Sequence, residues 1–305
     1  MKRPVFPILI FFLLISFFFS GCRKEAVPSA SAPSGPAPIT DALGRPFTPG
    51  PQPQRIISLV PAMTEILFAI GAGDALVGRT EYCDYPEEAH LVPSVGGFAG
   101  ATMSLEMIRF LEPDLVFLSA QMHERIVALL DQLGISSFAV EPAKLSEVYQ
   151  TIELTGLLTG CQEGAALLVS RMEAQIAGVQ SLVQGRPAPG VFWILSADPL
   201  MSAGRSTFIS EAIHLAGGRN IFDDVNEDWP LISPEQVIMR RPDWVLMGDD
   251  VGTSIESFEA NPLWRSLPAL SQGQVRMIDA GAFYRYGPRL AQAVEDLAQI
   301  LHGQR

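Results

Sequence analysis

The feature that most constrains the fold of this chain is an internal duplication. Residues 104–116 and 233–245 share one pattern: a Ser two positions before a Glu, a Pro-Asp pair seven positions after that Glu, and then an apolar run. Upstream, residues 64–71 and 210–217 pair in the same order, each with a hydroxyl residue, a Glu and a final Gly. Such a doubling predicts two similar lobes, with a cleft between them in which a ligand can bind.

Apolar runs alternate with helical segments in both halves. Residues 55–60, 75–78, 115–118 and 136–140 predict buried strands, and residues 191–195 start the same series in the second half. Short connections between strands and helices favour a parallel sheet with helices on both faces. We expect Thr64 to open the first helix, Gly71 to end it and Ser104 to cap the next. A further helix is expected from Glu124 to Leu133.

Two consecutive helices are expected between the halves. The first ends near Leu158, a break follows at Thr159 and Gly160, and the second runs from Gln162 to about Val183. The predicted fold is therefore α/β, with two lobes that are each a mainly parallel sheet flanked by helices. One long rigid helix joins the lobes, and the ligand cleft lies between them.

The N-terminus has the pattern of an export signal. Basic Lys2 and Arg3 precede an apolar stretch, and Cys22 follows small residues, so residues 1–21 are predicted to be a signal peptide and Cys22 the lipidated first residue of the mature chain. An ordinary signal peptide with an incidental Cys22 is the alternative. Residues 22–38 are rich in Ala, Pro and Ser and predict a disordered tether. Residues 39–160, 161–186 and 187–305 are then the first lobe, the linking helix and the second lobe.

The composition argues against several functions. A formal net charge of -12 without clustered basic residues makes nucleic acid an improbable partner. Three Cys encode no disulfide framework, and four His supply a transition-metal site poorly. The motifs of nucleophilic hydrolases, zinc peptidases and nucleotide-binding loops are missing. Asp198, Asp249 and Asp250 have no nucleophile or His beside them, so an enzyme is disfavoured. A lipoprotein that holds another protein is a further alternative.

Large side chains gather in the loops that should follow the strands. In parallel sheets these loops lie at the carboxyl edge, where ligands bind. The predicted lining is apolar and aromatic, suited to a large, flat ligand. It consists of Tyr82, Phe98, Met201, Trp229, Phe283, Tyr284 and Arg285.

Several motifs resemble the cobalamin-binding proteins of ABC importers. They are residues 55–61 with Thr64 and Glu65, 82–86, 105–116, 229–237 and 287–289. The similarity runs from about Ile39 to Leu301. It implies the periplasmic binding protein superfamily with a long helical backbone, which also carries haem and ferric siderophores. It further implies a monomeric, lipid-anchored, extracytoplasmic receptor without cofactor or metal, which hands cobalamin or a related corrinoid to a permease dimer with its ATPase.

The resemblance also implies roles for individual residues. Tyr82, Trp229 and Arg285 fall at ligand contacts of the family, whereas Phe98, Ser119 and Met201 stand where the family has Trp, Trp and Phe. A haem or siderophore is therefore the alternative ligand, and Tyr82 or His123 is the candidate axial ligand for haem.

Two acidic residues and two cysteines are expected to have roles other than ligand binding. The resemblance implies that Glu106 and Glu235 each form a salt bridge with an arginine of one permease subunit, while stabilisation of the two helix N-termini by these carboxylates is the simpler reading. Cys83 is expected to be a small, partly buried thiol and Cys161 to be structural.

Overall fold

The computed structural model describes residues 37–98 and 102–303 of the chain. The predicted signal peptide, Cys22 and the tether up to residue 36 lie outside the described residues. Within the described part, no helix combines the length and the apolar character needed to cross a bilayer.

Two four-stranded sheets with the same topology form the frame of the molecule. Every pairing within them is parallel, and the strand order is β4-β3-β5-β6 in the first and β10-β7-β11-β12 in the second. The first sheet contains β3 (Ile56–Ser58), β4 (Leu76–Arg79), β5 (Leu115–Ser119) and β6 (Ser137–Val140). The second contains β7 (Gly190–Ile194), β10 (Arg219–Asn220), β11 (Trp244–Gly248) and β12 (Val275–Ile278). The strand orders match position by position, so the sequence duplication corresponds to two lobes of one design.

Helices and short hairpins surround each sheet. The first lobe carries β1 (Ile39–Thr40), β2 (Pro46–Phe47), α1 (Pro61–Ala69), η1 (Gly73–Ala75), η2 (Glu87–Leu91), α2 (Leu105–Phe110) and α3 (Ala120–Gln132). The second carries β8 (Ser196–Ala197), β9 (Leu200–Met201), α6 (Phe208–Leu215), α7 (Pro234–Arg240), α8 (Ile255–Ala260), η4 (Pro262–Trp264), α9 (Pro268–Ser271), α10 (Ala280–Tyr284) and α11 (Leu290–His302). The α/β fold predicted from the sequence is confirmed.

Two predicted helix starts are wrong, and both errors come from misjudged caps. Helix α1 begins at Pro61 and not at Thr64, because a proline at the first helical position has no N–H that needs a partner. Helix α3 begins at Ala120 and not at Glu124, since the Ser119 hydroxyl accepts a hydrogen bond from the Met122 N–H. The cap predicted at Ser104 is confirmed, with a 3.1 Å bond from the Met107 N–H.

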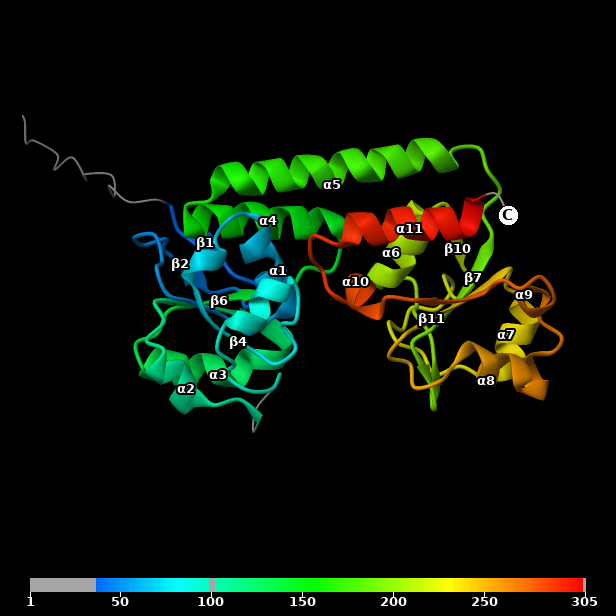
Figure 1. Ribbon diagram of the computed structural model, residues 1–305, viewed down its shortest axis with the longest axis horizontal. Helices are drawn as coiled ribbons and strands as arrows, with labels where there is room; N and C mark the ends of the chain where they lie inside the picture. The colour runs from blue at the N-terminus through cyan, green and yellow to red at the C-terminus, as the bar shows by residue number, and fades with distance from the viewer. Residues whose placement is uncertain (1–36, 99–101, 304–305) are drawn as a thin grey trace, which may run out of the picture. The chain divides into compact units, whose positions relative to one another are not determined.

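Helices α4 (Leu145–Thr159) and α5 (Gln162–Val183) connect the two lobes. Gly160 separates them in a left-handed conformation with φ of 73°, which glycine adopts without a steric penalty. Helix α5 packs against α4 of the first lobe and against α11 of the second, and Figure 1 shows it running along both. The long connecting helix therefore contacts both halves along its length.

One apolar core is shared by the two lobes. Neighbouring strand residues alternate between faces, so that Ile56 faces the shared core while Ile57 faces a smaller cluster confined to the first lobe. The shared core also takes in Trp193 of β7 and Leu297 of α11. Helix α5 contributes Ala165, Leu168, Val169, Met172, Ile176 and Val179. Burying these side chains contributes on the order of 10 kcal/mol to the free energy of folding.

Candidate ligand-binding site

Two adjoining cavities lie beyond the carboxyl ends of the strands, one with walls from both lobes and one within the second lobe. One, of about 440 Å³, is lined by Val60, Pro61, Ala62, Met63, Tyr82, Phe98, Ser119, Met122, Val140, Glu141, Pro142, Thr151, Tyr284, Arg285 and Tyr286. The other, of about 320 Å³, is lined by Leu195, Met201, Phe208, Ile209, Trp229, Phe283, Tyr284 and Tyr286. Tyr284 and Tyr286 border both cavities. Together the cavities form one cleft whose walls come from both halves of the chain.

The residues predicted to line a cleft are brought together here. Tyr82, Phe98 and Arg285 border the larger cavity, Met201 and Trp229 border the smaller one, and Tyr284 lies between them. Phe283, also predicted, borders the smaller cavity. Their role in ligand binding stays a prediction, since position alone does not test it.

The mouth of the cleft exposes aromatic surface to water. Tyr82 is 56% exposed and Trp229 is 38% exposed, each from a different lobe. The Tyr82 ring meets the Phe98 ring edge-on, with 5.8 Å between centroids. Such pairs hold ring orientation, and the exposed faces gain free energy when a flat ligand covers them.

Arg285 lines the cleft, but its charge is already paired across the lobes. Its guanidinium bonds both carboxylate oxygens of Asp84, one of them at 3.1 Å, and lies 3.5 Å from the Glu65 carboxylate. The hydrogen bond from Arg285 lowers the pKa of Asp84 below its ordinary value. A ligand at this wall therefore meets a neutralised ion pair and not an open positive charge.

Tyr284 presents its ring to the cleft and its hydroxyl to the protein interior. The hydroxyl oxygen is buried beside Gly248 and near the Trp193 indole. Burial raises the pKa of Tyr284 to about 12, so the phenol stays protonated at neutral pH.

His123 is wrong as a candidate axial ligand for haem. Its ring is fully buried: Nδ1 accepts a hydrogen bond from the Ser119 N–H at 3.0 Å, and Nε2 donates to the Phe98 carbonyl at 2.6 Å. Both nitrogens are occupied, and burial lowers the pKa of the imidazole. His123 instead positions Phe98, whose ring lies 5.5 Å from its own.

Sequence reasoning missed Tyr286 and Glu141 as cleft residues. Tyr286 borders both cavities and packs its ring against Phe208 at 5.2 Å. The alternation of Tyr284, Arg285 and Tyr286 was the available signal. Glu141 follows β6 and accepts a 2.7 Å hydrogen bond from the Ser119 hydroxyl. It places a carboxylate on a wall that is otherwise mostly apolar.

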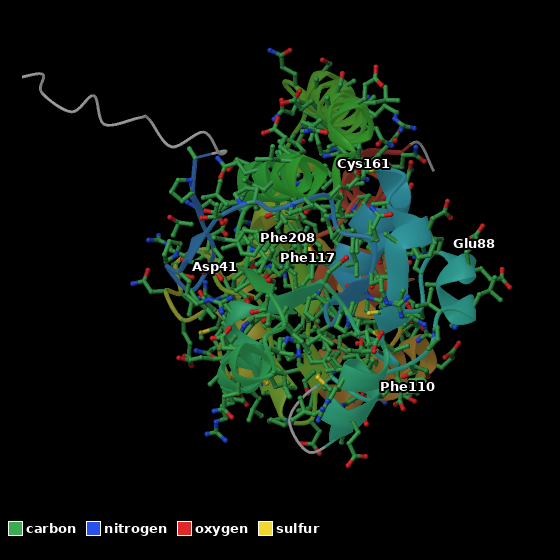
Figure 2. The ribbon with its side chains drawn as sticks, turned by 90° about the vertical axis from the view of Figure 1, so that its left-hand side faces the viewer. Asp41, Glu88, Phe110, Phe117, Cys161 and Phe208 are labelled. Atoms are coloured by element: carbon green, nitrogen blue, oxygen red, sulfur yellow. The ribbon has the colours of Figure 1, made fainter. Side chains whose placement is uncertain are left out.

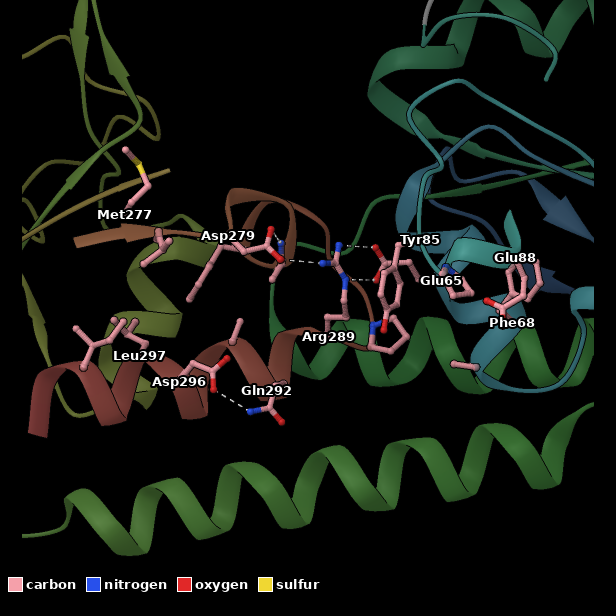
Figure 3. A pocket seen from close by; sticks show the side chains of 18 residues that line it. Glu65, Phe68, Tyr85, Glu88, Met277, Asp279, Arg289, Gln292, Asp296 and Leu297 are labelled. Atoms are coloured by element: carbon pink, nitrogen blue, oxygen red, sulfur yellow. Dashed lines mark hydrogen bonds and ion pairs between the residues drawn. The ribbon is translucent and has the colours of Figure 1, made fainter. Parts of the chain in front are cut away.

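A further groove between the lobes, of about 810 Å³, contains an ion-pair network built around the buried Glu65 (Figure 3). Arg289 donates to both oxygens of Glu65, at 2.9 and 3.1 Å, and to Asp279 at 3.0 Å. The Glu65 side chain is only 1% exposed, and burial raises its pKa while the two arginines oppose that rise. The Tyr85 ring covers the Arg289 guanidinium at 4.4 Å. Glu65 therefore joins the first lobe to the N-terminus of α11.

Glu211, the duplicated counterpart of Glu65, makes a similar contact from the second lobe to the first. Glu211 of α6 accepts a hydrogen bond from the Leu145 N–H, at 3.0 Å, where α4 begins. Each duplicated Glu thus reaches a residue at the start of a helix in the other half. Glu65 pairs with the Arg289 side chain just before α11, whereas Glu211 accepts the N–H of the first residue of α4, a group without a partner inside the helix. We call these two contacts the cross-lobe contacts.

Glu106 and Glu235 lie in the first turns of α2 and α7 and are exposed to solvent. A hydrogen bond with the Ser233 side chain lowers the pKa of Glu235. In Figure 1, α2 and α7 lie in different lobes, and both are distant from α5. The duplication therefore presents one exposed carboxylate per lobe at equivalent positions.

Neither cysteine within the described part of the chain belongs to a metal site. Cys83 is buried, 3.2 Å from the Thr80 hydroxyl, and Cys161 is half-buried just before α5. Across residues 37–98 and 102–303, no cluster of three or more His, Cys, Asp or Glu could hold a metal ion.

Comparison with known proteins identifies the family. The family model described as "Periplasmic binding protein" matches residues 56–282. The uncharacterized ABC transporter substrate-binding lipoprotein YvrC of Bacillus subtilis is 29% identical over 95% of each chain. The vitamin B12-binding protein of Photorhabdus laumondii is 30% identical over 82% of this chain and 88% of its own length. The periplasmic haem-binding protein RhuT of Roseiflexus superposes with a TM-score of 0.73 and 28% identity, over 82% of this chain and 98% of its own.

These matches span both lobes and the connecting helix, and they agree with the architecture described above. The chain belongs to the periplasmic binding protein family, as a substrate-binding protein of an ABC importer and not as an enzyme.

Proposed function

We propose that this protein is a lipid-anchored, extracytoplasmic receptor that captures cobalamin or a related corrinoid and delivers it to a permease dimer driven by an ATPase. The observation that carries the proposal is the cleft whose aromatic walls come from both lobes, with Tyr82 on one side and Trp229 on the other. A vitamin B12-binding relative that is 30% identical over most of the chain supports this choice of ligand.

The chemistry of the cleft suits a corrinoid. Such a ligand is broad and flat, has apolar ring edges with peripheral amides, and carries its own axial ligands on cobalt. It therefore requires aromatic walls and a few hydrogen-bonding groups, and no metal ligand from the protein. Glu141 and the Arg285–Asp84 pair supply polar groups beside the aromatic side chains.

Haem is the second candidate, because Tyr82 exposes a phenol at the mouth of the cleft and a haem-binding protein shares the fold at 28% identity. Haem requires an axial ligand. His123 is buried with both nitrogens engaged, which leaves Tyr82 as the candidate that the sequence had offered.

A titration separates the two ligands. Purified protein is titrated with cyanocobalamin, dicyanocobinamide and haemin while tryptophan fluorescence and the absorption spectrum are recorded. We expect saturable binding of a corrinoid, weakened about tenfold by Trp229→Ala, because this variant removes an exposed aromatic ring that the ligand would cover. Leu182→Ala on α5, outside the cleft, is the matched control and should leave affinity unchanged. Binding of haemin alone, lost in Tyr82→Phe, would favour the haem alternative.

We also propose that Glu106 and Glu235 dock the two lobes onto the two permease subunits. The double variant Glu106→Arg, Glu235→Arg should abolish uptake of labelled cyanocobalamin by cells while the affinity for cyanocobalamin in solution stays unchanged. Glu256→Arg is the control, because Glu256 also lies in the first turn of an exposed helix, α8, but outside the duplicated motif. Normal uptake by the double variant would refute the docking role.

A further inference from the structure

The duplicated motif places a second exposed feature beside each docking carboxylate. Phe110 follows Glu106 by four residues, and Met239 follows Glu235 by the same interval. Residues four apart lie on one face of a helix, about 6 Å apart along its axis. Phe110 is 78% exposed and Met239 is 74% exposed, which makes them two of the most exposed large apolar side chains in the described chain.

Single exposed apolar residues are common on soluble proteins and carry no meaning alone. Here the pattern of burial is duplicated together with the sequence. Ile108 and Val237, at matching positions between the Glu and the apolar residue, are both buried and fix the same face of α2 and α7 toward the core. The opposite face in each lobe therefore presents a carboxylate and a large apolar side chain.

We propose that Glu106 with Phe110, and Glu235 with Met239, form a two-part docking surface for a protein with two-fold symmetry. On each half the partner presents a cationic side chain beside an apolar pocket. The inference rests on the proposed docking role of Glu106 and Glu235 and adds the apolar half of the contact. Aromatic and Met side chains are enriched in the buried centres of protein interfaces, where they supply most of the affinity.

The charge of this surface argues for that partner over two others. A second copy of this acidic chain, with net charge -12, would bring like charges together. A bilayer with anionic headgroups would repel the two carboxylates. In Figure 2, Phe110 on α2 lies far from Cys161, where α5 begins, so the surface is separate from the helices that join the lobes. A dimeric permease offers the repeated, complementary site that one duplicated chain can match.

The test measures binding of the full chain to the permease–ATPase complex of the source bacterium in lipid nanodiscs. Phe110→Ser and Met239→Ser should each weaken the complex about tenfold, and the double variant should weaken it further. Leu91→Ser is the matched control, because Leu91 is 86% exposed but lies outside the duplicated motif. Phe110→Leu with Met239→Leu should restore binding to within about twofold, because the apolar character is retained.

The outcomes separate this inference from the proposed function. If the Ser double variant binds like the wild type while Glu106→Arg, Glu235→Arg does not, the apolar contact is refuted and the charged docking role stands. If both bind like the wild type, both proposals of docking fail, whereas the corrinoid titration still tests the ligand. If the wild type binds empty nanodiscs and the Ser double variant does not, the surface binds lipid and the inference is overturned. If the wild type is a homodimer in light scattering and the Ser double variant is a monomer, the surface binds a second copy, and the inference is likewise overturned.

Discussion

His123 and Tyr82 lie near the same wall of the cleft but offer different chemistry. His123 is fully buried, and its two ring nitrogens are held by the Ser119 N–H and the Phe98 carbonyl. Tyr82 is more than half exposed, and its ring packs edge-on against the Phe98 ring. The histidine therefore fixes the position of the wall, while the tyrosine is free to meet a ligand.

A pH dependence of stability follows from His123. Burial lowers its folded-state pKa below the ordinary value of 6.5, so the unfolded chain binds the proton more readily in the interval between the two values. Stability should fall as the pH drops below about 6.5 and continue to fall until the folded-state pKa is reached. Chemical denaturation of the wild type and of His123→Gln at pH 7.5 to 5 tests this. The variant should show the smaller slope with pH, and equal slopes would contradict the assignment.

Helix α5 depends on a close contact at its first turn. A side-chain carbon added at Gly164 would come within 2.2 Å of the Ile70 carbonyl oxygen, where α1 ends. Gly178 lies in the same helix, and a carbon added there meets nothing within 4 Å. The same residue type thus serves a packing role at one position and none at the other.

Substituting the two glycines should have opposite effects. Gly164→Ala should destabilise the protein by about 1–3 kcal/mol, because the backbone of α1 or α5 must shift to accommodate the methyl group. Gly178→Ala should stabilise it by about 0.5–1 kcal/mol, since alanine restricts the unfolded chain and favours the helix. Urea denaturation of both variants measures the difference. Changes of the same sign would show that α5 does not pack against α1 as described.

At the scale of secondary-structure elements, the sequence predicted those features that depend on the local pattern of residues. Apolar runs located the strands of the first sheet, and Gly160 located the break between α4 and α5. The start of α1 was missed because Thr64 resembles a cap while Pro61 already begins the helix. The pairing of Arg285 with Asp84 could not be predicted, because the partners lie 201 residues apart and only the fold joins them.

At the scale of the whole molecule, the cross-lobe contacts connect the two halves at two separate places. Glu65 reaches Arg289 before α11, and Glu211 reaches the Leu145 N–H at the start of α4. Because α4 and α11 both pack on α5, each contact ties one lobe to the helices that support the other. The arrangement favours small changes in cleft width over large rotations of the lobes.

The contribution of the Glu211 contact to stability can be compared with that of a hydrogen bond within one lobe. Glu211→Gln should destabilise the protein by about 1 kcal/mol, because a charged acceptor at a helix start is lost. Glu147→Gln is the matched control, since Glu147 accepts the Ala143 N–H at 2.7 Å within the same lobe and near solvent. Loss of the Glu147 hydrogen bond should lower the free energy of unfolding by a smaller amount. Urea denaturation compares the variants, and an equal loss for both would show that contact between the lobes adds nothing to stability.

The apolar core that runs beneath both sheets has a consequence for how the protein folds. Residues as far apart in the chain as Ile56 and Leu301 belong to one buried cluster. Neither half can complete that cluster by itself, so a fragment that ends after α5 would expose apolar surface to solvent. Calorimetry should record a single melting transition, and separately expressed halves should gain structure only when mixed.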